Sequence, residues 1–131
     1  MKYFHIKALT HSKEADDMKI DNTAPTYVIA NLTNLSNKIL EPLRELYGKP
    51  IYVKSGYKCP LLCTLTKENG NRHIKGQEVD ITGDSKEENK KIFDIIKNHF
   101  NFDSITLDKD CSLIHVSYVS NEQNRNEVVI I

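Results

Sequence analysis

The chain has 131 residues, 39% of them hydrophobic, and its 18 basic residues balance 18 acidic ones. A chain of this length can bury a core without disulfides, so we expect one domain over residues 1–131. The zero net charge, with no long block of one sign, argues against nucleic acid or an anionic membrane surface as a partner.

The first predicted element is an amphipathic helix. Apolar residues recur every three or four positions across residues 28–46, Pro25 suits a first helical position, and Gly48 suits a helix end. Pro42 lies inside this pattern and lacks an amide proton, so we expect a kink or restart there, with Glu41 at the break. We interpret this helix as part of the core.

Shorter elements follow. Residues 51–54 (IYVK) are rich in β-branched and aromatic side chains and predict a strand, and Pro60 predicts the start of a short helix through Leu65. The segment 67–72 contains an Asn-Gly-Asn run, which predicts a polar turn that leads to His73.

Residues 77–82 alternate between polar and apolar side chains, which predicts a strand. Val79 and Ile81 would face one side of it, whereas Glu78 and Asp80 would face the other. Asp80 therefore belongs to a polar strand face.

The last third of the chain predicts one helix and further strands. Residues 85–88 (SKEE) form a capping box before an amphipathic helix that ends at His99. Residues 104–108 and 112–119 predict a hairpin, and residues 126–131 predict a final strand. Together the elements indicate an α+β fold with a small antiparallel sheet and flanking helices.

His73, Asp80 and His115 are the most informative residues. They would supply imidazole, carboxylate and imidazole, a ligand set that suits zinc and leaves a fourth tetrahedral position for water, so it predicts hydrolysis. Strand alternation gives His115 and Asp108 the same polar face of the hairpin. We expect neighbouring polar faces of one sheet to carry Asp80 and His115, with His73 in the loop before them.

Six runs frame these candidate ligands: residues 20–25 (IDNTAP), 40–44 (LEPLR), 55–60 (SGYKCP), 73–81 (HIKGQEVDI), 102–105 (FDSI) and 114–117 (IHVS). Together they resemble the zinc D-alanyl-D-alanine carboxypeptidase family, and in particular its short phage-type members. This family also includes L-alanyl-D-glutamate endopeptidases. The resemblance implies a hedgehog- or DD-peptidase-like fold with one zinc ion, bound by His73, Asp80 and His115.

The resemblance leaves the proton acceptor open. Many relatives carry an acid three residues before the last histidine ligand, where this chain has Ser112. Phage-type relatives instead carry an acid in the strand after their Phe-Asp pair, and Asp108 matches it. We therefore predict Asp108 as general base. Glu78, where the family usually has a small residue, is its rival, and Asp110 is the third candidate.

Lys58 stands where the family usually has an arginine thought to bind a substrate oxygen near the metal. An ammonium supplies charge but no planar fork, so we expect substrate to be held differently here. The odd number of cysteines argues against a disulfide framework. Cys59, Cys63 and Cys111 allow a structural zinc site as an alternative, but free thiols are the better interpretation.

The resemblance implies a zinc metallopeptidase that acts on peptidoglycan stem peptides, as a D-Ala-D-Ala carboxypeptidase or an L-Ala-D-Glu endopeptidase. We expect a monomeric phage or prophage endolysin. No apolar run has the length of a membrane span or a signal peptide, which predicts cytoplasmic synthesis and action on the wall after release. The alternative is a catalytically silent zinc-binding module, a phage structural or wall-binding component, which the changes at Ser112 and Lys58 favour.

Overall fold

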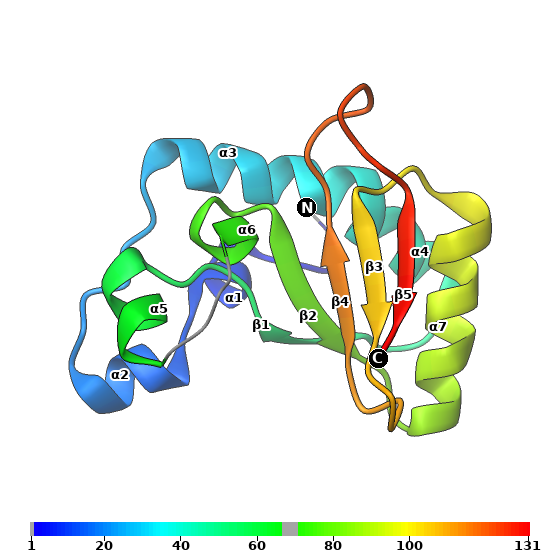
Figure 1. The fold of residues 1–131 in the computed structure, drawn as a ribbon, viewed down its shortest axis with the longest axis horizontal. Coiled ribbons are helices and arrows are strands. Elements are labelled where there is room, and N and C mark those ends of the chain that lie inside the picture. Colours follow the sequence, from blue (N-terminus) through cyan, green and yellow to red (C-terminus); the bar gives the residue numbers. More distant parts are fainter. Residues whose placement is uncertain (1, 67–70) are drawn as a thin grey trace.

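The computed structural model describes residues 2–66 and 71–131, so most of the predicted turn at 67–72 lies outside the described residues. One five-stranded sheet has the order β1-β2-β4-β3-β5 (Figure 1). Its strands are β1 Tyr52–Ser55, β2 Glu78–Thr82, β3 Ser104–Leu107, β4 Ile114–Ser117 and β5 Glu127–Ile130. The helices are α1 Ile6–Thr10, α2 Lys13–Met18, α3 Thr26–Leu35, the π-helical segment η1 Ser36–Leu40, α4 Glu41–Tyr47, α5 Pro60–Leu65, α6 Asn71–Ile74 and α7 Lys86–His99. The predicted α+β class is confirmed.

The predicted long helix is present as α3, η1 and α4 in succession. The helix changes type at the predicted place, since the amide of Glu41 donates to the carbonyl of Ser36, five residues back. A wider π turn accommodates Pro42, which has no amide to donate and would crowd the preceding turn of a regular α-helix. Gly48 ends α4 in the left-handed conformation, with φ of 78°. Pro25 precedes the first helical residue rather than occupying it.

The sheet is antiparallel across its first four strands, as predicted, but β5 runs parallel to β3. The reason lies in the connection from β4, which returns the chain to the beginning of β3. There the amide of Asn126 donates to the carbonyl of Phe102, and the amide of Glu127 donates to that of Asp103.

One face of the sheet packs against helices and the other is polar. The fully buried Ile81, Ile105 and Ile114 belong to the apolar core, which also includes Leu35 and Ile92 from the helices. Helix α7 contacts β3 and α4, and it lies at one end of the molecule, whereas α2 and α5 lie at the other (Figure 1). No helix in the described part of the chain is long and apolar enough to span a membrane.

Only half of the predicted capping box forms. The Ser85 hydroxyl accepts a hydrogen bond from the amide of Glu88, as a cap should. The Glu88 carboxylate instead accepts from the hydroxyl of Tyr47 at 2.6 Å and pairs with Lys49 at 2.8 Å. This acid therefore joins α7 to α4 rather than closing its own helix end.

The segment after β1 is held against the amino-terminal helices. A side chain at Gly56 would overlap the Leu9 carbonyl, at 2.0 Å, and the amide of Tyr57 donates to that same carbonyl. The Asn22 side chain donates to the carbonyl of Tyr57 and accepts from the amide of Cys59. These contacts fix the backbone that faces the site described next.

Candidate metal centre on the polar face of the sheet

Two of the predicted ligands lie opposite each other on neighbouring strands. Asp80 of β2 pairs in register with His115 of β4, which pairs in turn with Thr106 of β3. Residues directly opposite in a sheet project from the same face. His115 Nδ1–H accordingly donates to Asp80 Oδ1 at 2.7 Å.

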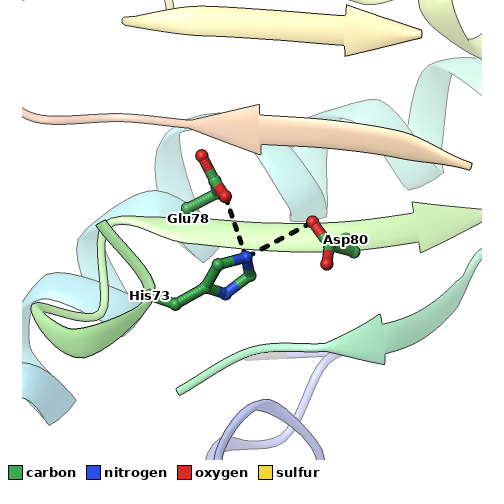
Figure 2. Close-up of side chains that lie close together, drawn as sticks. All are labelled: His73, Glu78 and Asp80. Carbon is green, nitrogen blue, oxygen red and sulfur yellow. Dashed lines mark ion pairs between the residues drawn. The ribbon is translucent and has the colours of Figure 1, made fainter. Parts of the chain in front are cut away.

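The third predicted ligand reaches the same place from α6, not from a loop as predicted. His73 is 5% exposed, and its Nδ1–H donates to the Gly56 carbonyl at 2.7 Å. A carbonyl can only accept, so this bond fixes the ring and leaves Nε2 facing the sheet. Figure 2 shows Nε2 pointing between Glu78 Oε2, at 2.8 Å, and Asp80 Oδ1, at 3.5 Å.

Gly76 makes the turn between α6 and β2 possible. Its φ is +71°, and a side chain there would lie 2.7 Å from the Val28 carbonyl of α3. The amide of Gly76 also donates to the His73 carbonyl. Only glycine permits both the left-handed backbone and this close approach, so residue 76 helps to set where His73 stands.

The donor set fits a divalent cation. Oδ1 of Asp80 contacts both Nε2 of His73 and Nδ1 of His115. Among the described residues, His73, Glu78 and Asp80 each offer a ligand atom within 4.8 Å of the others, and this group contains Glu78 but not the predicted ligand His115. Imidazole and carboxylate donors suit zinc, and the Gly56 carbonyl on the remote nitrogen is the usual partner of a ligating histidine.

The pKa values of these groups indicate that a bound cation would replace protons. Burial opposes charge on His73, but its hydrogen bonds to Asp80 and Glu78 raise its pKa to about 10. The hydrogen bond to Asp80 raises the pKa of His115 to about 9, against burial. Burial opposes ionisation of Asp80, yet the two histidines lower its pKa to about 2. Protons thus balance the carboxylates, and metal binding would release them.

The two candidate bases contact different sides of the cluster. Glu78 lies on the face of β2 that carries Asp80 and contacts the nitrogen of His73 that faces Asp80. Asp108 follows β3, and its Oδ1 accepts from Nε2–H of His115 at 2.8 Å. That nitrogen is the one remote from Asp80, where a carboxylate orients a histidine ring.

Asp110 and Ser112 form hydrogen bonds with each other. The hydroxyl and the amide of Ser112 both donate to Asp110 Oδ1, at 2.6 and 3.1 Å. Both residues are exposed in the connection between β3 and β4. Asp110 is therefore used to shape this turn.

Lys58 is almost completely buried, with 6% of its surface exposed, and its Nζ lies 3.6 Å from Glu14 of α2. It lines a cavity of about 140 Å³ together with Ser55 and Tyr57. Ser55 in β1 is the register partner of Asp80, so this cavity adjoins β2, the strand that carries one of the proposed ligands.

No disulfide joins the three cysteines in the described part of the chain; Cys59 and Cys63 are buried and Cys111 is half-buried. The group of potential ligands found among the described residues contains no cysteine.

Two groups that contact predicted site residues were not predicted from the sequence. The Gly56 carbonyl is a backbone group, which leaves no residue-type signal of its function. Glu14 lies far from Lys58 in the sequence and has no motif around it.

Comparison with known proteins gives one family. The model of the family described as Peptidase M15 matches residues 2–117, which include all three predicted ligands and both candidate bases. No curated protein matches the chain.

Proposed function

Because the chain belongs to the peptidase M15 family, we propose that it is a zinc metallopeptidase that hydrolyses peptidoglycan stem peptides, with the metal bound by His73, Asp80 and His115. It would act as a D-Ala-D-Ala carboxypeptidase or an L-Ala-D-Glu endopeptidase. One observation carries the proposal: Asp80 Oδ1 contacts a ring nitrogen of each histidine, at 3.5 and 2.7 Å, on the polar face of the sheet.

The three ligands are well prepared for this role. A bound zinc ion supplies Lewis acidity, polarising the scissile carbonyl and lowering the pKa of a water nucleophile. The Gly56 carbonyl fixes the orientation of His73, and Asp108 fixes that of His115. Pairing between β2 and β4 holds Asp80 opposite His115.

A carboxylate must take the proton from water and pass it to the leaving amine. The contacts favour Glu78 for this task, since its Oε2 adjoins the cation-facing nitrogen of His73 at 2.8 Å. The sequence favours Asp108, which stays a prediction, but its bond to the remote nitrogen of His115 also suits an orienting role. Replacing each acid by its amide separates the two.

Lys58 is proposed to hold a substrate oxygen from the cavity beside β1. Its ammonium is buried and balanced by Glu14, so a substrate carboxylate would compete with Glu14 for the same charge. A lysine there binds as a point charge and tolerates more than one direction of approach.

The test is incubation of purified protein with muropeptides of defined stem length, with and without a chelator, and identification of products by mass. The proposal expects metal-dependent loss of a terminal D-Ala or cleavage after L-Ala, and no product from His115→Ala. Intact stem peptides in the presence of stoichiometric zinc would contradict the peptidase activity.

That last outcome would support the second candidate, a zinc-binding module without turnover. Glu78 favours it to some degree, because a carboxylate in contact with His73 Nε2 can occupy a position that a catalytic site leaves to water. For an active enzyme, we propose an endolysin that reaches the wall after release from the producing cell.

A further inference from the structure

An ion-pair cluster around a buried carboxylate lies beside the proposed metal centre. Asp103, just before β3, is 1% exposed. Arg125 binds both of its carboxylate oxygens at 3.1 Å, Arg72 Nη2 lies 3.1 Å from Oδ2, and the Ser117 hydroxyl donates to the same oxygen at 3.1 Å. We call Asp103, Arg72, Arg125 and Ser117 the Asp103 cluster.

The cluster keeps a carboxylate ionised inside the protein. Burial opposes its ionisation, but the hydrogen bonds from Arg125 and Ser117 and the charges of both arginines outweigh burial and hold the pKa of Asp103 below its usual value. A buried carboxylate with this many partners is costly to leave unpaired, so removing one partner has consequences for the others.

Arg72 connects the Asp103 cluster to a proposed metal ligand. Arg72 immediately precedes His73 in α6, a helix of four residues that is too short to be stable by itself. Arg72 also binds the Gln77 side chain at 3.3 Å, and its carbonyl accepts from the amide of Gln77 at 2.8 Å. The guanidinium thus ties both ends of the turn that carries His73 to the start of β3.

Arg125, the other arginine of the cluster, belongs to a different part of the chain. Arg125 belongs to the connection before β5 and also pairs with Glu127 at 3.4 Å. The backbone amides of Asn126 and Glu127, which follow Arg125, donate to carbonyls of the two residues just before β3. Both arginines bind the same carboxylate, Arg125 through two hydrogen bonds and Arg72 through one contact, but only Arg72 is next to a proposed ligand. Arg125 is therefore the internal control.

We propose that Asp103, through Arg72, is a positioning residue that holds His73 in the orientation required for metal binding. The inference rests on the proposed role of His73 as a ligand. It assigns a function to the Phe-Asp pair of the sequence, which the ligand set and the candidate bases leave without one.

The test compares Arg72→Met, Arg72→Lys and Arg125→Met for zinc affinity, measured by competition with a chromophoric chelator. Arg72→Met should weaken zinc binding about 10-fold, the low end for loss of an outer partner of a ligand, and Arg72→Lys should restore part of it. Arg125→Met should lower the melting temperature but keep the wild-type zinc affinity. In an Asp103→Asn background, Arg72→Met should have little further effect on zinc.

A second measurement needs no metal. In the metal-free protein, Arg72→Met should speed hydrogen exchange at the amides of Gly76 and Gln77, whereas Arg125→Met should speed it in β5. Equal zinc affinities for Arg72→Met and Arg125→Met, or equal exchange at Gly76 and Gln77, would overturn the inference. Zinc binding without peptide cleavage would contradict only the proposed activity. Absence of zinc binding would contradict the proposed centre, and the exchange rates would still decide whether Arg72 positions His73.

Discussion

Raising the pH should destabilise the metal-free protein, because the buried His73 and the half-buried His115 hold protons that the unfolded chain releases at a lower pH. The pKa of His115 is raised to about 9 by its hydrogen bond to Asp80, and the bonds of His73 to Asp80 and Glu78 raise its pKa to about 10 against burial. Stability from both groups is fully present below pH 6.5 and is lost as the pH rises through 9 and 10.

The size of this loss follows from the pKa change. For His115, the rise from 6.5 to about 9 corresponds to about 3 kcal/mol of the free energy of unfolding. His73 shares Asp80 with His115, so its contribution does not simply add. A loss of about 3 kcal/mol in a chain of this size lowers the melting temperature by roughly 10 °C.

The assay is thermal unfolding of chelator-treated protein from pH 6 to pH 10, beside Asp80→Asn as control. Without the Asp80 carboxylate the histidines lose their main partner, so the alkaline decline should shrink. Zinc should reverse the trend, since deprotonated imidazoles bind metal better as the pH rises. A melting temperature that is constant or rises between pH 7 and 10 in the metal-free wild type would refute the protonation described for this cluster.

Three further sets of substitutions test the separate roles. His115→Ala should sharply reduce bound zinc in metal analysis, whereas changing the two buried cysteines to Ser should not; the opposite result would move the site to the thiols. Glu78→Gln and Asp108→Asn should be assayed side by side on one muropeptide. The variant that lacks the general base should be about 10²- to 10⁴-fold slower and should keep its normal zinc content. If both variants remain active, neither Glu78 nor Asp108 is the general base. Lys58→Ala should impair turnover and spare metal, while Lys58→Arg retains activity; unchanged kinetics in Lys58→Ala would remove this residue from the site.

The polar face of the sheet could be predicted because strand alternation is a local property. A period of two puts Glu78 with Asp80 on one strand and His115 on another, and the register then sets Asp80 opposite His115. The apolar partners of these residues, such as Ile81 and Ile114, fix which face is buried. Strand alternation was therefore sufficient to predict that Asp80 and His115 share a polar face, and their role as metal ligands stays a prediction.

What escaped prediction depends on contacts between distant parts of the chain. The bond from His73 to the Gly56 carbonyl requires the segment after β1 to pass beside α6, and nothing in the type of residue 56 reports an acceptor. The pairing of Lys58 with Glu14 spans the amino-terminal third of the chain. The parallel pairing of β5 depends on how the chain after β4 returns to Phe102.

The most direct test of the metal centre is a crystal structure of the zinc-loaded protein with anomalous data at the zinc edge. We predict one zinc ion at about 2.0–2.2 Å from His73 Nε2, His115 Nδ1 and an oxygen of Asp80. Zinc bound instead by Cys59 and Cys63, or by a set without His115, would contradict the account.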